Sequence, residues 1–371
     1  MMAIEARLAW QDAGIAHCDR LLLPPSALQA DGALVRLLPA LTAGETVTLD
    51  ASRWLKPAGE PEQRLPATAF RLRTAPVVGR FYPRLAFAGL AQGREDLRPC
   101  RLLAVEGDTL RVDVNHPLAG RGVGLTLQAT QTQAARGRFL DLLQGPGMQT
   151  PASAAATTDH PPAAFTRADA TEDAAFYARP RLVHHLDAAC RAELTRLYGR
   201  FLRPGLEVLD LMSSWASHLP ETPAELEVVG LGMNAEELAA NPRLARWLVH
   251  DLNRDPQLPF PAARFDLVLC TASVEYLIHP RAVFAELKRV LRPGGLAVFS
   301  FSDRWFPPKV IRLWTELHPF ERLGYVLGLL QQAGFTALHS ETLRGLARPP
   351  DDPYIAERDY SDPLFAAWGQ A

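Results

Sequence analysis

The sequence predicts two domains of different class, a β-rich domain in the N-terminal half and an α/β domain in the C-terminal half. Three observations predict this division. Short alternating runs broken by proline and glycine dominate the first part, whereas strands and helices alternate in the last part. Between them lies a stretch rich in Pro, Ala, Thr and Gly with neither periodicity. We therefore expect a β-rich domain at 1–143, a flexible linker at 144–170 and an α/β domain at 171–371.

The N-terminal half carries two clear β signals. The run Gly44–Ala51 alternates apolar and polar residues, as a half-buried strand does. The run Cys100–Val114 alternates on both sides of Glu106-Gly107-Asp108, a turn sequence that tolerates positive φ. The second run is therefore expected to form a hairpin.

The C-terminal half is expected to begin with a helix over Asp187–Leu202, with Asp187 as its N-cap. We expect "PGG" at Pro293–Gly295 to end a helix, and Gly334 to end the last one. The later elements are expected as strands at Glu207–Leu211, Glu227–Gly230, Leu248–Asp251, Phe265–Cys270 and Leu296–Phe301, and as helices at Ala235–Ala240, Arg281–Leu291 and Glu321–Ala333. In such sheets ligands bind at the carboxyl ends of the strands.

Composition narrows the classes of function. The 371 residues are 48% hydrophobic and 22% charged, with a formal net charge of -2, so no global field draws the chain to nucleic acid or to an anionic membrane. The four cysteines are scattered without a CxxC pair, which argues against a disulfide framework and a cysteine zinc site. No metal site is expected. With no secretory signal and no apolar run of about 18 residues, we expect a cytoplasmic protein.

The chain from about Arg179 onward resembles the class I S-adenosylmethionine-dependent methyltransferases, in particular the broad small-molecule group called type 11. Four segments carry the resemblance: "GLEVLDL" at 205–211, "EVVGLGMNAEEL" at 227–238, "LVHDLNRDPQLPFPAARFDLVLCTASVEYL" at 248–277 and "AVFAELKRVLRPGGLAVFSFSD" at 282–303. The resemblance implies a Rossmann-like fold with a mostly parallel seven-stranded sheet. It also implies S-adenosyl-L-methionine as cofactor and a small-molecule acceptor.

The resemblance also implies where the cofactor lies. Asp251 would accept a hydrogen bond from the adenine, to which the Leu252 backbone N–H would donate; the alternative for Asp251 is an N-cap or an exposed loop acid. The residues expected to contact the cofactor are Asp210, Met212, Ser213, Ser214, Gly232, Met233, Asn234, Asp251, Leu252 and Ser273.

Two departures from the family pattern touch this site. The family's glycine-rich loop after the first strand is replaced by "MSSWASHLP" from Met212, and a positive φ there would strain a non-glycine residue. The acidic residue that usually ends the second strand, and binds the ribose hydroxyls, is replaced by Gly232, with Asn234, Glu236 or Glu237 as substitutes. Losing that bond weakens affinity by about tenfold to a hundredfold. A similar variant, SSW-x-SHxP with GxGMNxxEL, occurs in methyltransferase-like proteins of bacteria and plants.

Residues near the strand ends are candidates for the acceptor side. Tyr276, Glu275 and His218 are the candidate catalytic residues, since a base is needed only for an acceptor that must lose a proton. The segment Phe176–Asp187 resembles the family's lid over the site. The expected substrate contacts are Trp215, Tyr177, His184 and Arg304. Each has an alternative: Trp215 as helix packing, His184 as a capping or surface residue, and Glu275 and Arg304 as solvated residues at strand ends.

The N-terminal half resembles SlyD-type FKBP prolyl isomerases. "EGDTLRVDVNHPLAG" at 106–120 resembles the end of their inserted flap, and "LLPALTAGETVTL" at 37–49 the segment before it. In that family Asn115–Gly120 would form a turn. The aromatic cluster of an isomerase pocket is not recognisable, so we expect an accessory domain rather than an isomerase.

The sequence thus favours a methyltransferase with an FKBP-like accessory domain and a small-molecule acceptor, with a protein acceptor as the other possibility. The competing hypothesis is a non-catalytic binding or chaperone protein, or a prolyl isomerase, on a scaffold that no longer binds the cofactor.

Overall fold

The structure is a computed structural model that describes residues 3–29, 31–55, 57, 59–72, 74–93, 96–144, 160–222 and 225–371. The C-terminal half contains seven strands in the order β11-β10-β9-β12-β13-β15-β14. Of these seven, only β15 runs opposite to its neighbours β13 and β14, so the predicted mostly parallel seven-stranded sheet is confirmed. The strands are β9 (Glu207–Leu211), β10 (Glu227–Gly232), β11 (Arg246–Val249), β12 (Phe265–Thr271), β13 (Leu291–Phe301), β14 (Thr336–Arg344) and β15 (Leu364–Gln370).

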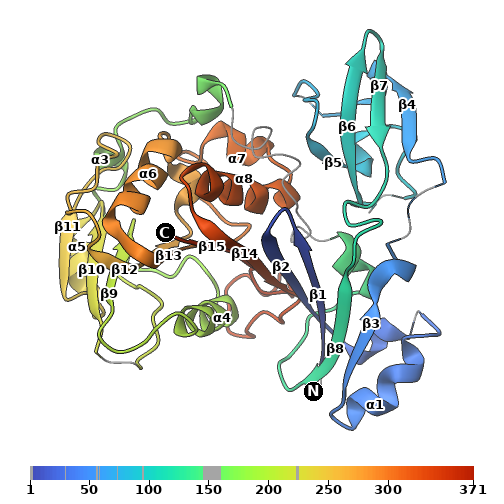
Figure 1. The fold of residues 1–371 in the computed structure, drawn as a ribbon, viewed down its shortest axis with the longest axis horizontal. Helices are drawn as coiled ribbons and strands as arrows, with labels where there is room; N and C mark the ends of the chain where they lie inside the picture. The colour runs from blue at the N-terminus through green and yellow to red at the C-terminus, as the bar shows by residue number, and fades with distance from the viewer. Residues whose placement is uncertain are drawn as a thin grey trace.

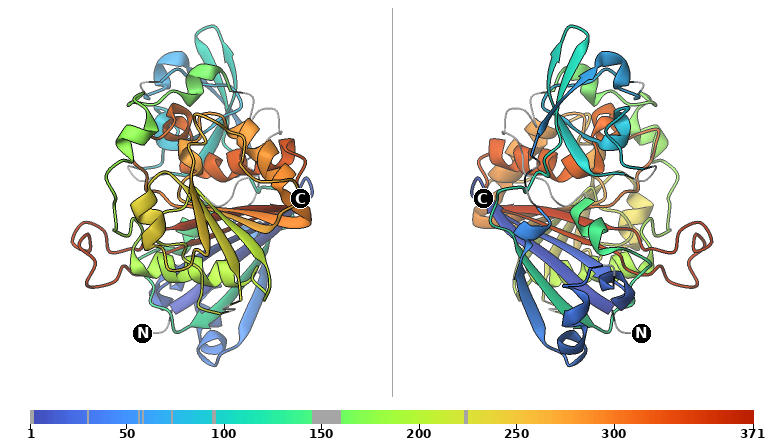
Figure 2. Two further views of the ribbon diagram at one scale, coloured as in Figure 1. Left: turned by 90° about the vertical axis from the view of Figure 1, so that its left-hand side faces the viewer. Right: turned by 90° about the vertical axis from the view of Figure 1, so that its right-hand side faces the viewer.

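Apolar cores cover both faces of this sheet, because neighbouring residues along its strands point to opposite faces. On β9, Val208 packs toward α4, while Leu209 packs into the core shared with α6 and α8. Figure 2 shows α4 on one side of the sheet and α6 and α8 on the other. The helices are α3 (Asp173–Phe176), α4 (Ala188–Gly199), α5 (Ala235–Ala240), α6 (Pro280–Val290), α7 (Arg312–Glu316) and α8 (Pro319–Gln332).

Most predicted boundaries in this half are close to those observed. Asp187 caps α4 by accepting a hydrogen bond from the Cys190 backbone N–H at 3.0 Å. Gly334, with φ of +83°, follows α8. One local prediction is wrong: "PGG" does not separate a helix from a strand, because β13 already begins at Leu291 and runs through it. There the pairing with β12 shifts register between Phe265 and Leu267.

The N-terminal half divides into two sheets. The strands β1 (Ala3–Asp12), β2 (Ile15–Leu23), β3 (Thr46–Asp50) and β8 (Gly124–Thr130) lie next to one another, with α1 (Leu38–Thr42) beside β3. The other four, β4 (Glu62–Pro66), β5 (Phe81–Pro83), β6 (Pro99–Glu106) and β7 (Thr109–Asp113), form a separate antiparallel sheet. The predicted hairpin is β6–β7, with Gly107 at φ +58°. His116 and its neighbours form the expected turn, in which the Ala119 N–H donates to the His116 carbonyl.

The N-terminal half was expected to be a separate domain, but part of it belongs to the same sheet as the C-terminal half. Strand β2 pairs in parallel with β14, from Ala16 opposite His339 to Leu21 opposite Arg344, so eleven strands form one continuous sheet. Figure 1 shows β2 beside β14 in the middle of the molecule. The two strands also share buried polar contacts: Arg344 donates to Asp19 at 2.7 Å, and His17 and Ser340 are hydrogen-bonded at 2.7 Å.

The four-stranded sheet contacts the C-terminal half at α8. The Arg80 guanidinium and the Phe81 backbone N–H both donate to the Glu321 carboxylate, each at 3.0 Å. Within the predicted linker, residues 145–159 lie outside the described residues. Residues 160–170 are packed against the C-terminal half, since the Asp169 N–H donates to the Pro308 carbonyl and Arg167 bridges to Ile311. None of the helices in the described ranges has the length and apolarity needed to span a membrane.

Candidate active site

A cavity of about 340 Å³ lies at the carboxyl ends of β9, β10 and β12. This is where ligands bind in sheets whose strand order reverses, as it does here between β9 and β12. Its walls come from the loops that follow five strands and from the segment before α4. Of the predicted site residues, sixteen line it: Tyr177, His184, Asp210, Met212, Ser213, Ser214, Trp215, His218, Gly232, Met233, Asn234, Asp251, Leu252, Ser273, Tyr276 and Arg304.

The loop after β9 is held by the aspartate that ends this strand. The Asp210 carboxylate accepts hydrogen bonds from the Ser213 and Ser217 hydroxyls, both at 2.6 Å. Burial raises the pKa of Asp210 to about 6, which these two hydrogen bonds counteract in part. Met212 has φ of +56°, so the strain anticipated for a non-glycine residue in this loop is present.

The missing acid at the end of β10 has a steric explanation. The loop crosses directly over Gly232, where the Ser213 N–H donates to the neighbouring Leu231 carbonyl at 2.8 Å. A Cβ built on Gly232 would collide with the Ser213 carbonyl oxygen, far inside van der Waals contact. No side chain fits here, so neither Asp nor Glu could occupy this position with the present loop.

Asn234 uses its side chain within the protein. Its oxygen accepts from the Glu237 backbone N–H at 3.0 Å and caps α5, and its amide donates to the Tyr177 carbonyl at 2.9 Å and the Ala178 carbonyl at 3.1 Å. Glu237 accepts from the Ser214 hydroxyl at 2.6 Å and from the Arg181 N–H at 2.7 Å. These bonds tie the segment before α4 across the end of β10.

Asp251 combines the two roles considered for it. One carboxylate oxygen accepts from the Asn253 backbone N–H at 2.9 Å and the Arg254 N–H at 3.3 Å, which caps the turn. The other, Oδ2, makes no hydrogen bond with the residues that the structure describes, and Asp251 lines the cavity beside the buried Leu252. One acceptor oxygen is therefore available to a ligand.

The candidate catalytic residues differ in their access to the cavity. The Tyr276 hydroxyl accepts from the Phe306 N–H at 2.8 Å, and burial raises its pKa well above the usual value, so it is not a base. The structure does not bring Glu275 into the cavity: its side chain is buried on the other side of this turn, toward α8, and burial raises its pKa to about 8. The acceptor-facing placement expected for Glu275 is therefore corrected.

The histidines and Trp215 form one wall. The rings of His184 and Trp215 lie 4.5 Å apart, and the Trp215 indole N–H donates to the Val183 carbonyl at 3.1 Å. His218 lines the same wall, and burial lowers its pKa to about 4. His218 is therefore neutral at pH 7, and the same burial makes it a weaker base than a solvent-exposed histidine.

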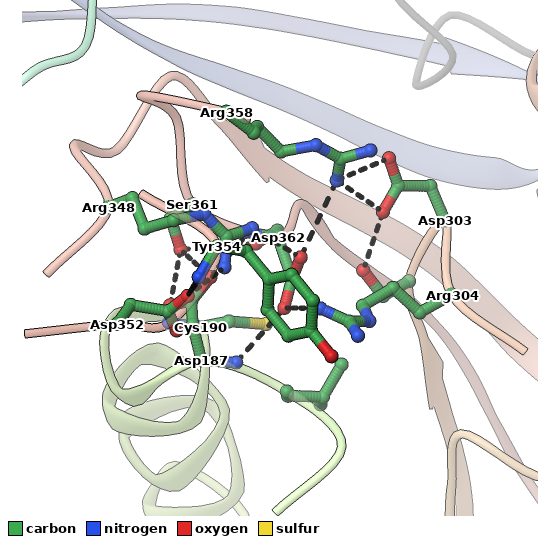
Figure 3. A network of polar contacts seen from close by, with 12 residues as sticks. Asp187, Cys190, Asp303, Arg304, Arg348, Asp352, Tyr354, Arg358, Ser361 and Asp362 are labelled. Carbon is green, nitrogen blue, oxygen red and sulfur yellow. Dashed lines mark hydrogen bonds and ion pairs between the residues drawn. The ribbon is translucent and has the colours of Figure 1, made fainter. Parts of the chain in front are cut away.

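Arg304 lies where the cavity meets a buried polar network (Figure 3). Its guanidinium is 3.6 Å from the Asp362 carboxylate and lies over the Tyr354 ring. Asp362 also accepts from the Asp187 backbone N–H at 3.0 Å and from Arg348 at 2.8 Å. The network therefore joins the start of α4 to the loop that follows β13.

Several lining residues were not among the site residues predicted from the sequence. The more informative are Asp173, Arg181, His185, Asn253, Trp305 and Phe306. Asp173 is paired with Arg167 at 2.6 Å and with Lys309 at 3.3 Å, so its charge is neutralised within the protein. Arg181 lies in the aromatic run "FYARPR", whose composition was the available signal. In the described parts of the chain, no group of three or more His, Cys, Asp or Glu side chains is arranged to hold a metal ion.

Comparisons with known proteins agree with this location. Residues 214–299 match the family model described as "Methyltransferase domain". Over 134 residues the chain is 28% identical to the ubiquinone/menaquinone biosynthesis C-methyltransferase UbiE of Laribacter hongkongensis, covering 33% of this chain and 52% of that protein. Over 61 residues it is 33% identical to the malonyl-[acyl-carrier protein] O-methyltransferase of a Marinomonas species, covering 16% and 23%. The chain thus spans no more than about half of these curated relatives.

Solved structures are similar to about half of this chain. An S-adenosylmethionine-dependent methyltransferase from Mesorhizobium loti is 20% identical, with a TM-score of 0.33, covering 50% of this chain and 99% of that one. A methyltransferase from Archaeoglobus fulgidus is 14% identical, with a TM-score of 0.37, covering 49% and 93%.

The family match implies S-adenosyl-L-methionine as the cofactor. The residues present fit such a group. Asp251 Oδ2 is available at a strand end, the buried Leu252 supplies an apolar wall beside it, and the cavity has the volume of a small-molecule site.

Proposed function

We propose that the protein is an S-adenosyl-L-methionine-dependent methyltransferase that acts on a small molecule. The observation that carries the proposal is the cavity at the carboxyl ends of β9, β10 and β12, in which sixteen predicted site residues come together. The family match of residues 214–299 supports it. When bound, the cofactor would supply a methyl group on a sulfonium centre.

In this proposal the cofactor end of the cavity consists of Asp251, Leu252, the loop after β9 and the end of β10. Asp251 would accept from the adenine through Oδ2, and Leu252 would pack against it. Because Gly232 carries no side chain and the Asn234 amide is engaged, the ribose hydroxyls would be bound by backbone groups and by Glu237. Ser273 would accept a hydrogen bond, since its hydroxyl already donates to the Thr271 carbonyl.

The acceptor end consists of the segment before α4, the loop after β13 and Tyr276. Phe306 would pack against the acceptor, and the packed rings around it would exclude water from the transfer. His218 is our candidate base for an acceptor that must lose a proton, because it is neutral and lines the cavity. The relatives include a C-methyltransferase and an O-methyltransferase. We therefore expect the shared segment to bind the cofactor rather than to select one acceptor atom.

In this proposal the N-terminal half, up to about residue 143, is an accessory region of FKBP type that shares its sheet with the C-terminal half. The protein would be cytoplasmic. A second candidate function is a non-catalytic binding protein. One observation favours it: Asp210, Asn234 and Glu237, which could contact the cofactor, already have partners in the protein.

Calorimetric titration of the full chain with S-adenosylhomocysteine separates the two candidates. A methyltransferase is expected to bind it with a micromolar Kd, and S-adenosylmethionine similarly. No heat of binding at millimolar ligand would contradict the proposal and favour the binding protein.

A further inference from the structure

The acceptor end of the cavity has two guanidinium groups whose hydrogen-bond donors the protein does not fully use. This inference rests on the proposed function, because it concerns the molecule that would accept the methyl group. Two arginines line this end, Arg181 from the segment before α4 and Arg304 from the loop after β13. Of the lining acids, Asp173 is already neutralised by Arg167 and Lys309, and Glu237 accepts hydrogen bonds from the Ser214 hydroxyl and the Arg181 backbone N–H.

Arg181 carries the stronger observation. Its guanidinium lies over the Phe176 ring at 4.6 Å, and also faces the Phe306 and Tyr177 rings at 5.6 and 5.8 Å. Nη2 donates to the Phe176 carbonyl at 3.1 Å. Nη1 is shielded from solvent and has no hydrogen-bond partner among the residues that the structure describes. A buried guanidinium nitrogen without an acceptor is unfavourable, so an anionic ligand oxygen would be strongly favoured beside it.

Arg304 adds a second cation with incomplete pairing. Its only ion pair among the described residues is with Asp362, at 3.6 Å. That carboxylate also accepts from Arg348 at 2.8 Å and lies 3.5 Å from Arg358. Figure 3 shows these arginines converging on Asp362. Arg348 and Arg358 also pair with carboxylates of their own, Asp352 and Asp303. Arg304 reaches Asp362 only at 3.6 Å, which is longer than a hydrogen bond, so its donors remain for a ligand.

Flat aromatic surfaces lie beside these cations. Phe306 stacks with Tyr276 at 6.0 Å and an interplanar angle of 29°, and His185 meets Phe306 edge to face at 5.0 Å. His185 is held neutral, because burial lowers its pKa. A planar ligand body would pack against the cavity-facing side of these rings, with its charged group turned toward Arg181.

We propose that the acceptor is a planar molecule that carries a carboxylate, and that Arg181, assisted by Arg304, binds this carboxylate. Guanidinium groups match a carboxylate in two parallel hydrogen bonds, which a point charge cannot do. The methionine part of the cofactor also carries a carboxylate. The test must therefore separate a carboxylate on the acceptor from the carboxylate of the cofactor.

The test uses benzoate as a planar anionic probe and benzamide as its neutral match, titrated by calorimetry into the full chain saturated with S-adenosylhomocysteine. We expect benzoate to bind at least about tenfold more tightly than benzamide. Arg181→Gln should weaken benzoate binding by roughly tenfold and Arg304→Gln by less, without changing the affinity for S-adenosylhomocysteine. Arg179→Gln, an exposed arginine of the same segment, is the matched control and should change neither affinity.

Three results would overturn the proposal. The first is equal binding of benzoate and benzamide, or none of either. The second is benzoate binding that Arg181→Gln leaves intact. The third is a loss of affinity of Arg181→Gln for S-adenosylhomocysteine, down to the affinity for methylthioadenosine, which lacks the carboxylate. That result would show that Arg181 binds the carboxylate of the cofactor and not one of the acceptor.

If Arg181→Gln is unstable, Arg181→Lys takes its place in the test. It keeps the positive charge but not the forked guanidinium, so we expect it to bind benzoate with intermediate affinity. Binding of benzoate without S-adenosylhomocysteine binding would support the anion site while contradicting the proposed methyltransferase function. The two failures are therefore distinguishable.

Discussion

The two ends of the cavity differ in how their polar side chains are used. At the cofactor end, Asp210 accepts hydrogen bonds from two serine hydroxyls, and Glu237 accepts two further hydrogen bonds. Asn234 caps α5 and also binds the segment before α4. At the acceptor end, Arg181 and Arg304 have donors that no described residue fully occupies. One end is organised by its own contacts, whereas the other keeps donors that a ligand could use.

The difference teaches how a site can lose its glycine-rich loop and still keep its shape. The serines of the loop donate hydrogen bonds to Asp210 and Glu237, so the loop geometry depends on side-chain hydrogen bonds. These bonds leave fewer groups for the cofactor, which makes the remaining oxygen of Asp251 more important. The acceptor end could vary independently, because its cations do not support the loop.

The largest effect is expected just behind the acceptor end, at Glu275. Burial raises its folded pKa to about 8 from the usual 4.5, so the folded state retains a proton that the unfolded state has lost. The free energy of unfolding should therefore fall as pH rises from about 5 through 8, by on the order of 3 to 5 kcal/mol. Glu275→Gln does not titrate, and is expected to melt at a higher temperature than the parent at pH 9 but not at pH 5.

Calorimetric melting at the two pH values measures this. Glu236→Gln, an exposed residue, serves as control and should follow the parent at both. If Glu275→Gln shows the same pH dependence as the parent, the carboxyl is not the titrating group. The affinity for S-adenosylhomocysteine should be unchanged, since Glu275 does not line the cavity.

The next effect tests the organised end at Gly232. Gly232→Ala forces a methyl group against the Ser213 carbonyl, so the loop must move. We expect a loss of about 3 kcal/mol in unfolding free energy, measured by denaturant titration, together with weaker S-adenosylhomocysteine binding. The control is Gly199→Ala at the end of α4, where a Cβ would meet only Pro220 at an ordinary 3.7 Å. Equal stability of the two variants would show that the loop is not fixed over β10.

The importance of Asp251 can be measured as binding. Asp251→Ala should reduce the affinity for S-adenosylhomocysteine by at least about tenfold, roughly 1.4 kcal/mol or more, through loss of its open oxygen. Asp255→Ala is the matched control, because Asp255 also accepts a backbone N–H two residues on, from Gln257 at 2.9 Å, but does not line the cavity. Unchanged affinity in Asp251→Ala would refute the adenine contact.

The smallest effect concerns backbone strain at Met212. Met212→Gly and Met212→Ala both remove the side chain, but only alanine retains the cost of φ +56°. The glycine variant should therefore be more stable than the alanine variant by about 1 kcal/mol in denaturant titration. If alanine is the more stable of the two, the strain does not exist in solution.

The sequence predicted the parallel sheet well, because alternating strands and helices leave few arrangements open. Strand β9 and helix α5 have the predicted limits, and sixteen site residues share one cavity. The family resemblance indicated these residues, and they share one cavity because the loops after parallel strands meet at one edge of the sheet.

Other features depend on contacts between distant residues. Gly232 was interpreted as a lost acid, but its reason is the Ser213 carbonyl nineteen positions earlier in the chain. Glu275 and Tyr276 are adjacent in the sequence, yet only Tyr276 lines the cavity, because a side chain's direction at a turn is not visible in periodicity. The pairing of β2 with β14 was missed because neither strand was among those predicted. The residue pattern of a strand also does not show which other strand will pair with its edge.

That pairing has a consequence for biosynthesis. His17 and Ser340, which bond across β2 and β14, are 323 residues apart in the chain. During translation at about 5–20 residues per second, the outer edge of β2 would stay unpaired for roughly 15 to 65 seconds, until its partner strand is synthesised. A nascent or truncated chain that stops before β14 would present β2 as an open template for other chains, and would be expected to depend on chaperones until synthesis is complete.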